Sequence, residues 1–273
     1  MSNLHALIFD VDGTLADTES EGHRPAFNAA FRELDLGWEW SIPLYGELLA
    51  IAGGKERIYH YLERFHTEYL GEGGEAFIAD LHHRKTRHYL SRLTQGGIPF
   101  RPGVRRLLTE ARAAGLTLAI ATTTTPENVT GLIIANLGPE AVGWFKVIAA
   151  GDVVAAKKPA PDIYRHVLKS LALDPWQCVA FEDTEQGLTA AKGAGIDCVV
   201  VTVNGYTARQ DFQTATLVLD HLGDASTGCR RLAGAAFAAD HLTDLPLLVW
   251  PNINKYIFKS MHCDNLTAWS VPM

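Results

Sequence analysis

The chain has few cysteines and lacks any long apolar run. Its 273 residues include four cysteines, none of them in a Cys-x-x-Cys pair, so we expect neither a zinc site nor a disulfide framework. No apolar stretch approaches the roughly 20 residues of a membrane span, and Asp10 and Asp12 would interrupt the core of any signal peptide. We therefore expect no membrane partner and a reducing compartment. The cytoplasm is our prediction, with the plastid stroma as the alternative if a transit peptide has been removed.

An excess of positive charge is also missing. The sequence contains 24 Lys and Arg against 31 Asp and Glu, which gives a formal net charge of -7. An acidic chain is poorly suited to nucleic acid, whose binding depends on Lys and Arg contacts to phosphates, so we expect no nucleic-acid partner. The apolar content of 47% is sufficient for a sizeable core. We expect a monomer of one large domain or two small ones.

Apolar runs alternate with helical patterns in the second half of the sequence. The runs span residues 116–121, 147–150, 178–181 and 198–203. Strands that are apolar on both faces are typical of a parallel sheet covered by helices on each side. Between them, apolar residues recur at helical spacing and glycines stand at the predicted helix ends. The pattern predicts an α/β fold, a doubly wound Rossmann-like parallel sheet.

Residues 18–94 have a different character. They contain helical stripes over 26–34, 57–65 and 77–93, with many charges and few strand signals. We predict that they form a helical cap domain inserted into a core domain of residues 1–17 and 95–225. A helical insertion beside the edge of a sheet can act as a lid. Residues 226–273 show no clear period and are predicted to be a C-terminal tail of unclear role.

Two carboxylates follow the first apolar run. Asp10 comes directly after Ala6–Phe9, Asp12 stands two residues later, and Gly13 opens a loop. A period of two would turn both carboxylates to the same side, at the carboxyl edge where open α/β sheets bind ligands. Their repulsion requires a cation or a shared proton, and Mg²⁺ is the natural oxygen-bound cation. Taken alone, the pair is as typical of a calcium loop or a solvated turn as of a catalytic site.

Threonines and a lysine follow two of the later apolar runs. Thr122 to Thr125 stand at a strand-to-helix junction, where hydroxyls and backbone amides can cradle a phosphate. Capping of the next helix by Thr125 explains the same residues without a ligand. Pro159 restricts Lys158 to an extended conformation, so its ammonium could neutralise a carboxylate and a phosphate together. The alternative for Lys158 is a solvated basic turn.

Glu182 and Asp183 end another apolar run, 178–181. Acidic residues at the start of a helix are favoured by the helix dipole, which is explanation enough if no ligand binds. The functional interpretation is a further delivery of carboxylates to the same sheet edge, where they complete a metal site.

The order of these motifs is more specific than any one of them. Asp-x-Asp-Gly-Thr, Thr, Lys-Pro and Glu-Asp each follow a predicted strand, and in this combination the chain resembles the haloacid dehalogenase superfamily of aspartyl-phosphate phosphatases over roughly residues 4–222. The resemblance implies Asp10 as nucleophile and Asp12 as general acid and base. It also implies that Thr122 binds the phosphoryl oxygens and that Lys158 holds the nucleophile. The implied Mg²⁺ ligands are Asp10, Asp12 through its backbone carbonyl, Glu182 and Asp183.

Segments of the predicted cap narrow the resemblance. Residues 17–28, 44–49 and 53–57 are similar to those of the CbbY-type sugar phosphatases, a group close to β-phosphoglucomutase. The implied substrate is a small phosphorylated sugar, xylulose-1,5-bisphosphate, an inhibitor of Rubisco that is hydrolysed to xylulose 5-phosphate. Basic side chains could pair with its second phosphate, although each could also be ordinary surface charge. The implied substrate contacts are Glu19, His23, Tyr45, Lys55, Arg57, Lys85 and Thr123.

Three functions remain open at this point. The first is a magnesium-dependent hydrolase of a sugar bisphosphate. The second is a phosphomutase of the β-phosphoglucomutase type, which would use the same residues around the phosphoryl group. The third is a non-catalytic regulator on the same fold, which the presence of Asp10, Asp12, Lys158 and Asp183 disfavours.

Overall fold

A parallel sheet forms the centre of the computed structural model, which describes residues 4–223 and 229–233. The strand order is β3-β2-β1-β4-β5-β6-β7, and all neighbours are parallel except β6 and β7. The doubly wound α/β fold is therefore confirmed. The strands are β1 (Ala6–Phe9), β2 (Thr117–Ala121), β3 (Phe145–Ala149), β4 (Cys178–Glu182), β5 (Cys198–Thr202), β6 (Leu217–Leu219) and β7 (Arg231–Ala233).

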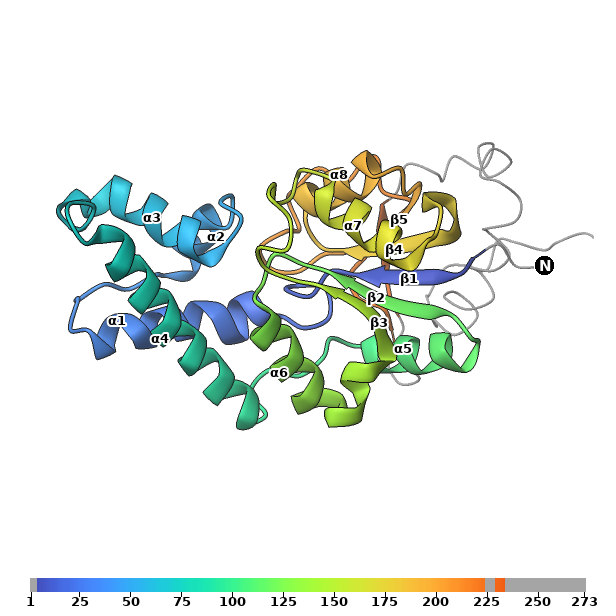
Figure 1. The fold of residues 1–273 in the computed structure, drawn as a ribbon, viewed down its shortest axis with the longest axis horizontal. Helices are drawn as coiled ribbons and strands as arrows, with labels where there is room; N and C mark the ends of the chain where they lie inside the picture. Colours follow the sequence, from blue (N-terminus) through green and yellow to red (C-terminus); the bar gives the residue numbers. More distant parts are fainter. Residues whose placement is uncertain (1–3, 224–228, 234–273) are drawn as a thin grey trace, which may run out of the picture.

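Helices cover both faces of this sheet (Figure 1). The helices α5 (Val104–Ala113) and α6 (Pro126–Leu137) pack on one face, and α7 (Asp162–Leu171) and α8 (Glu185–Gly193) pack on the other. Short 3₁₀ turns, Pro139–Trp144 and Pro175–Gln177, lead into β3 and β4. Because β1 lies between β2 and β4, the winding reverses beside β1. The carboxyl end of β1 is therefore the expected ligand site of such a sheet.

The segment between β1 and α5 is helical and extends beyond the carboxyl edge of the sheet (Figure 1). It has its own core of aromatic side chains, among them Phe27, Phe31 and Trp40, which are fully buried. We call these elements the cap helices, although the division into cap 18–94 and core 1–17 and 95–225 stays a prediction. They are the π-helix Glu19–His23, α1 (Arg24–Glu33), α2 (Ile42–Leu48), α3 (Gly54–Phe65), the 3₁₀ turn Thr67–Tyr69 and α4 (Gly74–Thr94).

Several features were not predicted from the sequence. The helices α2 and α7 were missed, as were β6 and β7, which have three residues each. The predicted tail 226–273 lies mostly outside the described residues, but it contains β7. Cys178 and Cys198 are free and buried as expected, whereas Cys229 is disulfide-bonded. That bond contradicts the expectation of no disulfide. The sequence shows no spacing of cysteines that indicates it. Among the described residues, no helix combines the length and hydropathy needed to cross a bilayer.

Candidate active site

Lys158 joins two carboxylates at the carboxyl ends of β1 and β4. Its ammonium donates hydrogen bonds to Asp10 Oδ1 at 2.6 Å and to Glu182 Oε1 at 2.6 Å. All three side chains are buried. The hydroxyl of Tyr164, on α7, also donates to Glu182 Oε1 at 2.6 Å. One cation and one hydroxyl therefore fix both carboxylates, as a buried ion pair requires.

Asp183 adds a third carboxylate to this group. One oxygen each of Asp10, Glu182 and Asp183 lie within 4.8 Å of one another. Burial raises the pKa of Asp10 to about 7, although Lys158 opposes the shift. Burial also raises the pKa of Asp183 well above its ordinary value. Three carboxylates facing a single lysine are short of positive charge, and an all-oxygen set of this kind suits a hard divalent cation such as Mg²⁺.

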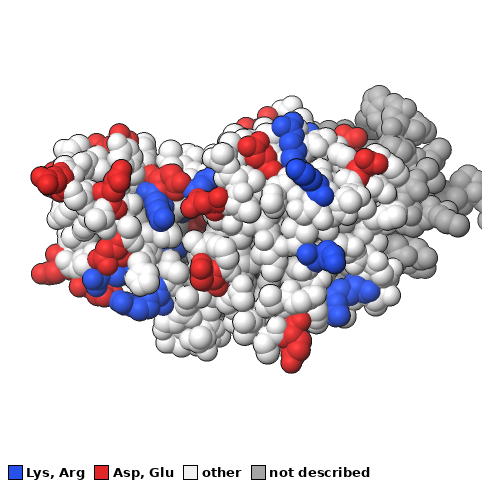
Figure 2. Space-filling model, in the orientation of Figure 1, with Lys and Arg blue, Asp and Glu red and all other residues white. Residues whose placement is uncertain are grey.

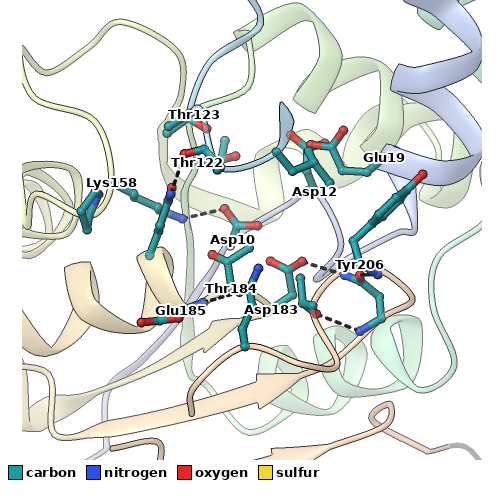
Figure 3. Close-up of a pocket in the computed structure, with 18 of the residues that line it drawn as sticks. Asp10, Asp12, Glu19, Thr122, Thr123, Lys158, Asp183, Thr184, Glu185 and Tyr206 are labelled. Carbon is teal, nitrogen blue, oxygen red and sulfur yellow. Dashed lines mark hydrogen bonds and ion pairs between the residues drawn. The ribbon is translucent and has the colours of Figure 1, made fainter. Parts of the chain in front are cut away.

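Asp12 faces the cap helices rather than this carboxylate group (Figure 3). Its Oδ1 accepts hydrogen bonds from Thr18 Oγ1 at 2.6 Å and His23 Nε2 at 2.9 Å. On the far side of the imidazole, Lys85 Nζ donates to His23 Nδ1 at 2.8 Å. The ring stacks on Tyr89 with centroids 4.3 Å apart. Burial works to raise the pKa of Asp12, but His23 and Thr18 together lower it to about 2.

Glu19 is held from behind by two buried residues. The hydroxyl of Tyr45 donates to Glu19 Oε2, and Arg57 Nη1 donates to that hydroxyl at 3.1 Å. The remaining bonds of Arg57 go to the carbonyls of Leu48 and Ile51, both at 3.2 Å. Tyr45 is fully buried, so the structure puts it behind Glu19 and away from the cavity wall.

A cavity of about 500 Å³ separates the cap helices from the sheet. The core contributes Asp10, Thr122, Lys158 and Asp183 to its wall, and the cap helices contribute Glu19 and Arg57. Figure 3 shows Glu19 on the opposite side of the site from Lys158, with Asp10 between them. On the face drawn in Figure 2, acidic and basic residues mix where the two parts of the molecule meet. The cavity thus combines a carboxylate, a fixed ammonium and a hydroxyl, the kinds of group that phosphoryl transfer needs.

A second hollow of about 160 Å³ adjoins this cavity. Asp12, Glu19 and Thr123 line both spaces. The hollow lies between the amino end of α6 and the helices α3 and α4, and Lys55, His82 and Lys85 line it from the cap side. On the core side, Thr125 Oγ1 and Asn128 Oδ1 are buried without a hydrogen-bond partner among the described residues. The structure therefore brings most of the predicted substrate contacts together around two connected spaces.

Sequence reasoning missed several residues of the site. Asn204 donates through Nδ2 to Asp183 Oδ2 at 2.7 Å, and Thr18 and Tyr164 bond the other carboxylates. Asn204 precedes Gly205 directly after an apolar strand, a turn signal at the carboxyl edge that could have identified it. No sequence signal distinguishes Thr18 or Tyr164 from other residues of their helices.

Comparison with known proteins places the chain among hydrolases. The haloacid dehalogenase-like hydrolase family matches residues 4–195. The plasmid-encoded protein CbbY of Cupriavidus necator is 51% identical over 222 residues, which are 81% of this chain and 87% of that protein. A crystal structure of a CbbY mutant from Rhodobacter sphaeroides in complex with xylulose-1,5-bisphosphate is 42% identical, with a TM-score of 0.73 over 82% of this chain and 98% of its own. Beta-phosphoglucomutase of Bacillus subtilis is 29% identical over 212 residues, 72% of this chain and 83% of that protein.

Proposed function

Since the chain belongs to the haloacid dehalogenase-like hydrolases, alongside the CbbY proteins, we propose that it is a magnesium-dependent phosphatase of a small sugar bisphosphate. Our best substrate is xylulose-1,5-bisphosphate, hydrolysed to xylulose 5-phosphate. The observation that carries the proposal is the convergence of Asp10, Lys158 and Asp183 on a cavity that continues into a second hollow. A substrate with two separated phosphates fits two connected polar spaces better than a monophosphate does.

At the first phosphate, Asp10 attacks phosphorus and forms an aspartyl-phosphate while the sugar oxygen leaves. Lys158 offsets the charge of the attacking carboxylate, and the hydroxyl of Thr122 binds a phosphoryl oxygen. Asp12 protonates the departing sugar oxygen and then accepts a proton from the water that hydrolyses the aspartyl-phosphate. Magnesium would be held by Asp10, Glu182 and Asp183, with a contribution from the Asp12 carbonyl, and supplies neutralising charge to the phosphoryl oxygens when bound.

At the second phosphate, the hollow beside α6 supplies the recognition. Lys55 is exposed at the start of α3 and lines the hollow, so it can pair with an incoming anion. Thr125 Oγ1, which has no hydrogen-bond partner in the part of the chain that the structure describes, and the amino end of α6 add a hydroxyl and backbone donors. Glu19 stands between the two spaces and is placed to accept hydrogen bonds from the sugar hydroxyls.

The remaining predicted contacts act in two ways under this proposal. Thr123 lines both spaces, so we expect it to contact the sugar phosphate. His23 and Lys85 affect the substrate indirectly, because they position Asp12. Tyr45 and Arg57 likewise position Glu19.

A phosphate-release assay with magnesium tests the proposal. The protein is incubated with sugar bisphosphates and monophosphates, and the products are separated by chromatography. Free phosphate that accumulates without an isomeric sugar phosphate supports the hydrolase, and an isomeric product without free phosphate supports the phosphomutase. The Asp10→Asn variant, which keeps the shape but cannot attack, should fold and release no phosphate. Activity of that variant near the parent level would exclude Asp10 as the nucleophile.

A further inference from the structure

Arg101 is a buried arginine that bonds almost entirely to backbone carbonyls. It follows α4, where the chain returns to the core, and only 8% of its surface is exposed. Its Nη1 donates to the Gly13 carbonyl and, at 2.9 Å, to the Thr202 carbonyl. Its Nη2 donates to the carbonyls of Val203 at 2.5 Å and Asp220 at 2.8 Å. A buried guanidinium is costly unless its donors are used, and here they join the loops that follow β1, β5 and β6.

Two of these loops enclose Asp183. Asn204, the residue after Val203, donates to Asp183 Oδ2 at 2.7 Å. Gly13 approaches from the other side, where a Cβ would lie 2.1 Å from Asp183 Oδ2 and 2.6 Å from Asn204 Nδ2. The backbone of Gly13 therefore packs directly on the pair formed by Asp183 and Asn204. Arg101 holds the carbonyls of Gly13 and Val203. It therefore sets the distance between the two loops that enclose Asp183.

The same arginine also lies where the chain crosses between the cap helices and the core. Its backbone amide donates to the Leu15 carbonyl at 2.9 Å, and Phe100 forms an antiparallel bridge with Ala16. Its Nε lies 3.3 Å from Asp17 Oδ1. The outgoing chain at 15–17 and the returning chain at 100–101 are thus fastened to each other and to the strand ends.

We propose that Arg101 is a positioning residue that fixes Asp183 through Gly13 and Asn204 and ties this carboxylate to the segments 15–17 and 100–101, where the chain crosses between the core and the cap helices. The inference rests on the magnesium site of the proposed function. Arg101 thereby gains a role in metal affinity that is separate from a general role in stability. The reason is that the guanidinium bonds both loops that enclose Asp183, a candidate metal ligand.

Magnesium binding by the folded protein tests this role. Isothermal titration calorimetry with MgCl₂, without substrate, compares the parent with Arg101→Lys and Arg106→Lys. Lysine keeps the charge but cannot span several carbonyls. Arg106 is the matched control, since its Nη2 also donates to backbone carbonyls, those of Leu222 at 2.9 Å and Gly223 at 3.0 Å, outside the Asp183 loops. We expect Arg101→Lys to weaken magnesium binding about tenfold and Arg106→Lys to change it less than twofold, with both variants losing stability.

A double-mutant cycle with Asn204→Ala adds a second readout. If Arg101 acts through Asn204, the two changes weaken magnesium binding less than additively in free energy. Should Arg101→Lys fail to fold, Thr202→Val takes its place, since it removes only the Oγ1 acceptor 3.1 Å from Nη1. We expect a two- to threefold loss of affinity there.

Two results would overturn the inference, and they can be told apart. If the parent binds magnesium and the Arg101 or Thr202 variant binds it equally well, the positioning role fails while the proposed function stands. A parent protein that binds no magnesium would end both.

Discussion

The buried carboxylates around Lys158 make the stability of the protein depend on pH in an unusual direction. Asp10 ionises near pH 3.8 in an unfolded chain, and burial raises its pKa to about 7 in the folded protein. Between these values the folded protein carries a proton that the unfolded chain has lost. Because the folded state binds more protons, the free energy of unfolding falls as the pH rises through this window.

The magnitude follows from the size of the pH interval. One pH unit within the window is worth about 1.4 kcal/mol for one proton. Raising the pH from 5.5 to 7 should therefore cost the cation-free protein about 2 kcal/mol through Asp10 alone. Asp183, whose pKa is also raised by burial, acts in the same direction. Asp12, with a pKa lowered to about 2, is ionised in both states over this interval and contributes nothing to the change.

Urea unfolding at a series of pH values between 5.5 and 7.5 measures this dependence. With EDTA, we expect the free energy of unfolding to fall by about 1 to 2 kcal/mol more in the parent than in Asp10→Asn across the series. His82, whose pKa burial lowers to about 3, acts in the opposite direction in both proteins. With saturating Mg²⁺, which favours the ionised carboxylates, the loss should disappear or reverse. Asp10→Asn is the matched control, because it removes one titrating group and should flatten the curve. A slope in EDTA that is the same in the parent and in the Asn variant would refute the reasoning.

Three further changes address the cap side of the site. Lys55→Ala should raise KM about tenfold for a bisphosphate and less than twofold for a monophosphate in phosphate-release assays, and equal losses would remove its role at the second phosphate. Lys85→Met removes the donor behind His23, so kcat should fall at least tenfold and its pH profile should move. An unchanged profile would detach Lys85 from Asp12. Glu56→Gln breaks the partly exposed ion pair with Lys157 between α3 and the core. If this pair helps the cap helices to close over the substrate, KM should rise up to about fivefold and lose its salt dependence. A fall in kcat alone would contradict that role.

The sheet could be predicted because its strands carry their own signals. The runs that became β2, β4 and β5 are apolar on both faces, as a covered parallel strand requires. The strands β6 and β7 have three residues each, too few to show a pattern. The helix α2 was missed because its signal is a cap, Ser41 accepting from the Leu44 amide at 3.3 Å, rather than a repeated apolar stripe.

The site was predictable where a motif follows a strand. Asp10, Thr122 and Lys158 follow strands and meet at one cavity, because all parallel strands deliver their carboxyl ends to one edge. Arg101 could not be found in this way, since its partners lie far away in the sequence. A buried arginine bonded to carbonyls at 13, 202, 203 and 220 is a product of tertiary structure and leaves no local pattern.

The two aspartates of the first motif stand two residues apart, yet their surroundings shift their pKa values in opposite directions. Asp10 is buried among carboxylates, which keeps its proton until about pH 7, whereas Asp12 accepts from His23 and Thr18 and is ionised above about pH 2. Each value is the reverse of what the first step of the proposed mechanism needs, which is an ionised nucleophile and a protonated acid. Positive charge beside Asp10 and a phosphoryl dianion beside Asp12 shift both in the required direction. The substrate and the cation would therefore set the two protonation states together. Without them, below neutral pH, Asp10 keeps its proton and cannot act as a nucleophile.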